Sequence, residues 1–197
     1  MPAQNSAARY GNVAMTFHWI IAALILTNLC LGFYFANVMG HDDPSFFMIV
    51  QLHKSIGLTV LVLSVLRLGW RLINPIPPLP ADFSPAMRVL ARGTHYLFYF
   101  LIVAVPFVGW TMVSASSLGT PTSYFGLFNW PQLPFFATLS RADKRAYHEL
   151  FGTAHAVLAY TMFGLVLVHV AAALWHHYSR RDDVLKRMIP GTRVPTA

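Results

Sequence analysis

The sequence predicts an all-α fold, an integral membrane four-helix bundle, and two observations predict it. First, of the 197 residues 56% are hydrophobic and only 11% are charged, whereas a soluble domain usually carries about a quarter charged residues. Second, no Asp, Glu, Lys or Arg occurs in residues 10–40, 93–140 or 150–179. Each run can supply the roughly 20 apolar residues that a membrane-spanning helix needs. The period-two alternation of an outer-membrane barrel is absent.

Four spans are expected, and together they form one membrane domain covering residues 1–197. The spans cover residues 13–36, 46–71, 87–113 and 141–178. The polar segment NVMGHDDPS forms the turn between the first two spans. The proline-rich segment NPIPPLPADFSP joins the second and third spans as a stiff, extended connector. The last connection is long and aromatic, and Ser140 followed by Asp143 predicts the N-cap of the fourth span.

The distribution of positive charge predicts the orientation of the chain. With four spans, both chain ends and the connector after the second span lie on one side of the membrane. That side holds ten of the 14 Lys and Arg residues, and the other side holds the remaining four. Positive loops favour the cytoplasm, so both termini are expected in the cytoplasm, with the chain in a bacterial inner membrane. The net charge of +7 then reflects topology, and no nucleic-acid partner is expected. The ten residues are Arg9, Arg67, Arg71, Arg88, Arg92, Arg180, Arg181, Lys186, Arg187 and Arg193.

The last span carries a stripe of histidines at heptad spacing. His148, His155, His169 and His176 belong to one series of seven-residue steps, in which Met162 occupies the remaining position. Helical positions seven apart differ by only about 20° in direction. His155 and His169 therefore share a face and lie about 21 Å apart along the axis. One metal ion cannot bridge that distance, so the stripe predicts two separate sites.

Each of these sites needs a partner from another span. The first span runs outward and the second runs back, so His18 lies at the depth of His169 and His53 at the depth of His155. Imidazole is a good ligand for iron, copper and zinc. Cys30 is the only cysteine, which excludes Cys-based metal sites and covalent attachment through a C-x-x-C-H motif. Two imidazoles without cysteine or carboxylate favour haem iron over zinc, which prefers four ligands.

Four segments of the chain resemble the bacterial cytochrome b561 family. They are MTFHWIIAALIL, QLHKSIGLTVLVLSVLRLGWR, THYLFYFLIVAVPFVGW and LVHVAAALWHHY. The resemblance covers residues 9–190 and is closest to the branch that includes superoxide oxidase. It implies two non-covalent b-type haems between the helices and electron transfer between the periplasmic side and the ubiquinone pool. Its implied axial ligands are His18, His53, His155 and His169.

The sequence departs from that branch at one ligand. In superoxide oxidase a His-Glu pair supplies the periplasmic ligand, fourteen residues before the next one. Here the pair His148-Glu149 lies twenty-one residues before His169. That spacing would separate the irons by about 31 Å, close to the full apolar core of a bilayer. The spacing favours His155 as the ligand and leaves His148 as the alternative.

Two further histidines and three arginines belong to the expected cytoplasmic end. By resemblance, ubiquinone binds there, and His95 or His176 can hydrogen-bond its headgroup or pass a proton. Arg67, Arg71 and Arg92 are candidates for haem propionates or the headgroup. The alternative for the arginines is that they only extend from the membrane core to the polar surface on the positive side.

The electron donor decides the function. If superoxide is the periplasmic donor, the chain is an enzyme, a superoxide:ubiquinone oxidoreductase. If a redox protein is the donor, the chain is a haem-carrying membrane subunit that serves a dehydrogenase or hydrogenase. A third hypothesis is a haem-free proton or metal transporter lined by histidines.

Overall fold

The computed structural model describes residues 3–6, 9–80 and 82–192, so Arg193 lies outside the described residues. Four long helices dominate it: α1 Asn12–Asn37, α2 Phe46–Ile73, α3 Pro85–Ser114 and α4 Arg141–Trp175. All four are long and apolar enough to cross a membrane. In a bilayer a helix satisfies its own backbone hydrogen bonds, which makes it the natural form of such runs. The predicted fold class, an all-α membrane bundle, is confirmed.

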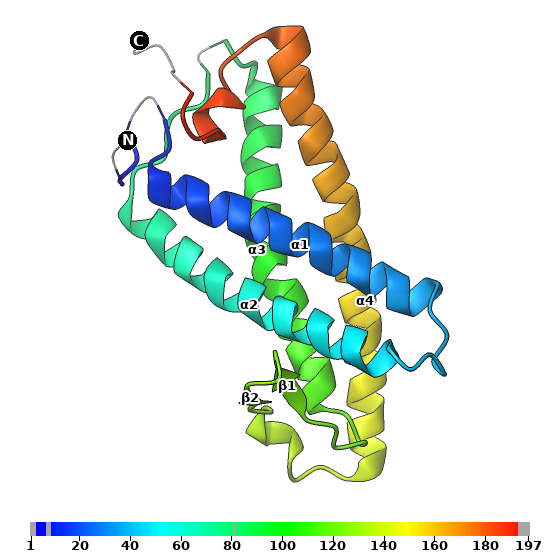
Figure 1. Ribbon diagram of the computed structural model, residues 1–197. Coiled ribbons are helices and arrows are strands. Elements are labelled where there is room, and N and C mark those ends of the chain that lie inside the picture. The colour runs from blue at the N-terminus through cyan, green and yellow to red at the C-terminus, as the bar shows by residue number, and fades with distance from the viewer. Residues whose placement is uncertain (1–2, 7–8, 81, 193–197) are drawn as a thin grey trace.

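The helices form two antiparallel hairpins. The helices α1 and α2 pack together, as do α3 and α4, and α2 also packs on α3. Figure 1 shows the first hairpin lying obliquely across the second. The short helix η3 Lys186–Met188 and the start of α1 lie at one end of the bundle, and the strands β1 and β2 lie at the other. The end with η3 and the start of α1 is called the terminal end. The end with the two strands, which form a β-hairpin, is called the hairpin end.

Serine caps define where two of the helices begin. Ser140 Oγ accepts a hydrogen bond from the backbone N–H of Asp143 at 3.1 Å and donates to its carboxylate at 2.7 Å. This is the predicted N-cap of the fourth span, and it is confirmed. Ser84 Oγ accepts from the N–H of Met87 at 3.3 Å in the same way, directly before Pro85 in the first turn. Such caps satisfy N–H groups that lack partners within the helix.

A buried apolar layer joins the two hairpins at mid-depth. Leu101 and Ile102 of α3 pack against Met162 of α4, and Ile25 and Leu29 of α1 pack onto this group. Met162 is only 2% exposed. It is also the position midway between His155 and His169 in the heptad series. The interior of the bundle is therefore closed by apolar side chains between the two histidine levels.

The long aromatic connection contains a β-hairpin that the sequence did not predict. Strand β1 Thr122–Tyr124 pairs antiparallel with β2 Phe128–Trp130. Phe125 and Gly126 occupy the turn with φ of 49° and 76°, and glycine adopts such values without steric cost. The hairpin is anchored on α2, because the N–H of Phe125 donates to Ser55 Oγ at 3.0 Å and Tyr124 Oη lies 2.9 Å from Thr59 Oγ1. A 3₁₀ helix, η1 Pro134–Phe136, follows.

Helix α4 ends differently from the predicted span. Its α-helical part stops at Trp175, and residues His176–Arg180 form a π-helical turn, η2. Arg181 then takes a left-handed conformation with φ of 57°, which reverses the chain. The following segment returns over the terminal end of the bundle, where Trp19 Nε1 donates to the carbonyl of Met188 at 2.7 Å.

Candidate functional site

Two pairs of histidines connect α4 to the other helix hairpin. The rings of His18 on α1 and His169 on α4 have centroids 6.3 Å apart and planes at 66°. The rings of His53 on α2 and His155 on α4 have centroids 6.2 Å apart and planes at 86°. The four residues therefore meet in the combinations that their depths in the sequence predicted. The first pair lies toward the terminal end and the second toward the hairpin end.

Backbone carbonyls hold one nitrogen of each ring in the second pair. His53 Nδ1 lies 3.1 Å from the carbonyl oxygen of Asn28 on α1. His155 Nδ1 lies 3.0 Å from the carbonyl oxygen of Val105 on α3. A carbonyl can only accept, so both rings carry their proton on Nδ1. The Nε2 atoms are left free to bind a metal, and an Nδ1–H donor of this kind normally orients a metal-bound imidazole.

A glycine one turn after each carbonyl makes these contacts possible. A Cβ placed on Gly32 would lie 3.0 Å from His53 Cε1, and one placed on Gly109 would lie 2.9 Å from His155 Cε1. Each glycine is four residues after the carbonyl that its histidine contacts, and so it supplies the helical N–H to that carbonyl. Any larger residue would crowd the approach of the ring. In both α1 and α3, a glycine four residues after the carbonyl leaves room for the histidine ring to reach that carbonyl.

The geometry of the pairs fits haem. Two imidazoles bound on opposite sides of one metal ion by bonds of about 2.0 Å place their ring centroids roughly 6 Å apart. Both pairs have that spacing. Among the described residues no group of three or more His, Cys, Asp or Glu side chains could hold a metal ion. A donor set of two neutral imidazoles suits a metal that brings its own equatorial ligands, as haem iron does.

Two arginines and two tyrosines lie beside the His18–His169 pair. Arg67 Nη2 is 3.4 Å from His18 Nδ1. The guanidinium carbons of Arg67 and Arg71 lie 5.4 Å and 4.5 Å from the centroid of the Tyr99 ring, and Arg71 Nη1 donates to Tyr99 Oη at 3.3 Å. Tyr10 is also close to Arg71, and its pKa is raised because burial outweighs the opposing effect of the Arg71 charge. Tyr10 therefore stays protonated.

Three other predicted residues belong to neither ring pair, although His95 lies close enough to His18 and His169 to act on both rings electrostatically. His148 Nδ1 is 2.9 Å from the carbonyl oxygen of Met112, so this ring contacts α3 and not His53. His95 Nδ1 is 2.6 Å from the carbonyl of Ala91 on its own helix. The side chain of Arg92 is exposed. Of the two candidates at the start of α4, the structure brings only His155 to His53.

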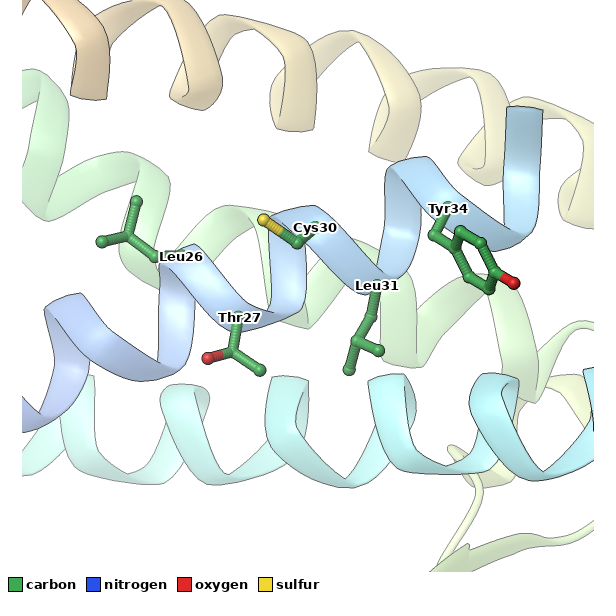
Figure 2. A pocket seen from close by; sticks show the side chains of 5 residues that line it. All are labelled: Leu26, Thr27, Cys30, Leu31 and Tyr34. Atoms are coloured by element: carbon green, nitrogen blue, oxygen red, sulfur yellow. The ribbon is translucent and has the colours of Figure 1, made fainter. Parts of the chain in front are cut away.

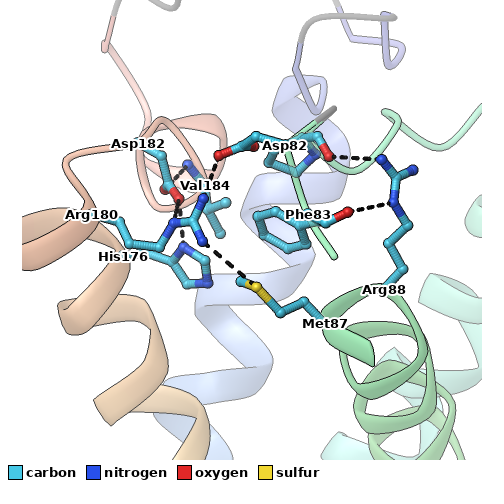
Figure 3. A network of polar contacts seen from close by, with 9 residues as sticks. Asp82, Phe83, Met87, Arg88, His176, Arg180, Asp182 and Val184 are labelled. Carbon is cyan, nitrogen blue, oxygen red and sulfur yellow. Dashed lines mark hydrogen bonds and ion pairs between the residues drawn. The ribbon is translucent and has the colours of Figure 1, made fainter. Parts of the chain in front are cut away.

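His176 belongs to a polar network at the terminal end. Its Nδ1 lies 2.6 Å from Asp182 Oδ2, and its ring stacks on Phe83 with centroids 5.4 Å apart. Arg180 forms an ion pair with Asp182 at 3.3 Å and another with Asp82. Figure 3 shows how these contacts tie the end of α4 to the connector before α3. Asp182 is not predictable from the sequence pattern, because only the π turn and the reversal at Arg181 bring it back to the imidazole.

Two open apolar pockets in the described part of the chain are lined by none of the histidines. One lies on α1, where Figure 2 shows Cys30 beside aliphatic and aromatic neighbours. The other lies between α3, α4 and the η1 segment. The first is lined by Leu26, Thr27, Cys30, Leu31 and Tyr34, and the second by Phe107, Val108, Thr111, Leu133, Pro134, Phe135, Phe136, Tyr147 and Phe151. Such apolar linings are normal for surfaces that face lipid, and they add no chemical group to the histidine sites.

Comparison with known proteins agrees with the geometry. A family model described as prokaryotic cytochrome b561 matches residues 9–191. The chain is 36% identical to cytochrome b561 homolog 2 of Escherichia coli (strain K12), over 94% of this chain and 93% of the relative. It is 30% identical to the probable superoxide oxidase CybB of Yersinia pestis, over 94% and 98%. It is 28% identical to cytochrome b562 of Cereibacter sphaeroides, over 91% and 94%. The chain belongs to the prokaryotic cytochrome b561 family, and it is a multi-pass membrane electron-transfer protein whose family implies haem b as cofactor.

Proposed function

We propose that the chain binds two b-type haems and relays single electrons between the two sides of the membrane. His18 and His169 would hold one haem, and His53 and His155 the other. The observation that carries this proposal is the pair of ring separations, 6.3 Å and 6.2 Å, at positions fourteen residues apart on α4. A haem iron bound by two imidazoles supplies a one-electron ferric–ferrous couple.

The protein's own residues separate and orient the two sites. The carbonyls of Asn28 and Val105 fix the Nδ1 proton of His53 and His155, which keeps Nε2 unprotonated and directed away from those helices. The apolar layer around Met162 excludes water from the space between the two levels. Each pair would therefore remain a distinct site in a dry interior, about 21 Å from the other along α4.

Superoxide is the proposed electron donor at the hairpin end. Lys54 directly follows His53, and Arg141 and Lys144 lie in the first turns of α4. These three side chains would attract a small anion locally, but together with Arg145 they only balance the four acidic residues of the same end, Asp42, Asp43, Asp143 and Glu149. The likeness to a relative named probable superoxide oxidase supports the same donor. Each superoxide anion would give up one electron and leave as dioxygen.

Ubiquinone is the proposed electron acceptor at the terminal end. One ubiquinone would take two electrons, delivered one at a time, and two protons, and leave as ubiquinol. Asp182 keeps a proton on His176 Nδ1 by accepting its hydrogen bond, so the imidazole can donate from Nε2 when it is protonated. Arg67 and Arg71 provide cationic hydrogen-bond donors near the same level. His95 and Arg92 would contribute at the edge of this region.

The proposed orientation places the terminal end in the cytoplasm of a bacterial inner membrane. Ten of the 14 Lys and Arg residues belong to the sequence segments of that end, and positive loops favour the cytoplasm. The superoxide end would then face the periplasm. Electrons would travel inward, and the protons for ubiquinol would come from the cytoplasmic side.

One set of measurements on the purified protein tests the proposal. Haem per chain is determined as the pyridine haemochromogen, and ubiquinone reduction is followed in a superoxide-generating system with and without superoxide dismutase. Two haems per chain and dismutase-sensitive ubiquinol formation are expected. Two haems without superoxide-driven reduction would favour a subunit that serves a partner dehydrogenase or hydrogenase. A colourless protein without haem would refute the proposal and favour the histidine-lined transporter.

A further inference from the structure

The two histidine pairs have different electrostatic surroundings. Carbonyl oxygens face Nδ1 of His53 and of His155. The guanidinium of Arg67 instead faces Nδ1 of His18. We infer that Arg67 makes the His18–His169 haem the stronger electron acceptor, so that the two haems have unequal reduction potentials. This inference rests on the proposed function, because it requires a haem at each pair.

The carbonyl contacts lower the potential of the haem at the hairpin end. An imidazole that donates its Nδ1–H to a carbonyl becomes more basic at Nε2 and gives more electron density to the metal. The ferric state gains most from that density, and reduction becomes less favourable. Both ligands of this site have such an acceptor, Asn28 for His53 and Val105 for His155. The two effects therefore add.

Arg67 has the opposite effect at the terminal end. When His18 binds a metal through Nε2, its proton resides on Nδ1. Arg67, whose Nη2 lies 3.4 Å from Nδ1, can then neither accept that proton nor donate to this nitrogen, and it acts only through its nearby positive charge. The imidazole stays a weaker electron donor, and the nearby positive charge favours the state of the haem with the additional electron. No ion pair joins Arg67 to an Asp or Glu within the described ranges. Its charge is therefore not cancelled by the protein there.

Lys54 acts on His53 at the other site, but more weakly than Arg67 acts on His18. It follows His53 by one residue on α2, so its side chain leaves the helix about 100° away from the imidazole. Arg71 is a closer match to Arg67. It has the same charge, lies on the same helix and contacts the same aromatic ring. Both guanidiniums lie over Tyr99, but only Arg67 contacts His18 Nδ1. Arg71 is therefore the natural control for Arg67.

This difference gives electron transfer a direction. An electron that enters at the His53–His155 level would move to a higher potential at the His18–His169 level. That level is the one next to the proposed quinone region. Arg67 would act on the haem through His18 and not by binding the metal, so it is a positioning residue.

Redox titration of the purified full chain tests the inference. The reduced haem absorbance is followed against potential in wild type and in R67Q, R67K and R71Q, with haem stoichiometry measured for each. His53→Ala and His155→Ala, which keep only the His18–His169 site, identify which step belongs to which haem. Electron paramagnetic resonance of the oxidised protein gives a second signature of each site. None of these readouts depends on turnover.

The Arg67 variants are expected to change only one of the two redox transitions, that of the His18–His169 haem. In wild type the His18–His169 haem titrates at the higher potential. R67Q lowers that step and leaves the other unchanged, R67K retains most of the wild-type value, and R71Q gives a clearly smaller shift. An unshifted step in R67Q, an equal fall in R67K, or an equal shift in R71Q would each overturn the role of Arg67. Failure of the wild-type chain to bind two haems would instead remove the proposed function, and this inference with it.

Discussion

His155 Nδ1 lies 3.0 Å from the carbonyl oxygen of Val105, the residue before the proline in the middle of α3. This contact fixes the imidazole toward α2, where its ring is 6.2 Å from that of His53. His148, two helical turns earlier, makes the corresponding contact with Met112 and has no such partner ring. The pairing therefore depends on which carbonyl of α3 each histidine reaches.

The periplasmic ligand is expected to be His155. The variant His155→Ala should lose one of the two haems, because it removes the ring opposite His53. The variant His148→Ala should retain both, since its ring contacts only a backbone carbonyl. Haem per chain checks both variants, and the wild-type spectrum is the control. Loss of haem from the His148 variant alone would show that the His-Glu pair supplies the ligand.

His18 and His169 should hold the same haem. His18→Ala and His169→Ala are each expected to lose one haem, and to lose the same one, because the two rings are 6.3 Å apart. Identical reduced-minus-oxidised spectra of the two variants, each with about half of the wild-type haem, would show this. If either variant kept both haems, or if the two lost different ones, the pairing would be wrong.

The glycines beside the histidines should be required for tight haem binding. An alanine at Gly109 would place its Cβ 2.9 Å from His155 Cε1 and push the ring away from the carbonyl. Loss of such supporting contacts typically costs about 10- to 100-fold in metal affinity, and a comparable loss of haem affinity is expected for Gly109→Ala and Gly32→Ala. Haem titration of the apoprotein measures it. Gly69→Ala and Gly93→Ala, with nothing within 4 Å of the added carbon, are the matched controls, and an equal loss in them would contradict the explanation.

The hydrogen bond between His176 and Asp182 at the end of α4 should affect electron delivery to quinone. His176→Ala and Asp182→Asn are expected to keep both haems and to slow haem oxidation by a ubiquinone analogue, because each disturbs the proton held on Nδ1. Loss of a proton donor commonly costs 10²-fold or more in rate, so a slowing of about that size is expected in stopped-flow traces. His177→Ala is the neighbouring control. Unchanged rates in both test variants would leave His176 with a structural role only.

The β-hairpin should depend on one buried hydroxyl. Ser55 is 1% exposed, and its Oγ accepts from the N–H of Phe125 at 3.0 Å and lies 3.2 Å from the carbonyl of Ser123. Ser55→Ala leaves the N–H of Phe125 without its acceptor, which costs about 1–3 kcal/mol. A lower midpoint of thermal unfolding and faster proteolysis within residues 122–130 are expected. Thr161→Ala, whose hydroxyl bonds only its own helix, provides the comparison.

The sequence by itself determined the four helices and the depth of each histidine. Uncharged apolar runs can satisfy their backbone only as helices in a bilayer, so the spans follow from local composition. The heptad spacing of His155 and His169 follows from the helical repeat, and alternating span direction then matches them with His53 and His18. Each of these inferences uses only the period, the length and the order of the helices.

Only the tertiary structure decided which atoms surround those rings. The open carbonyls at Asn28 and Val105, the guanidinium beside His18, and the carboxylate of Asp182 beside His176 are all contacts between separate segments. They depend on how α1 and α2 lie across α3 and α4 (Figure 1) and on where the chain reverses after α4. A helical period fixes the face on which a side chain lies, but the packing of one helix on another fixes the atom that it meets.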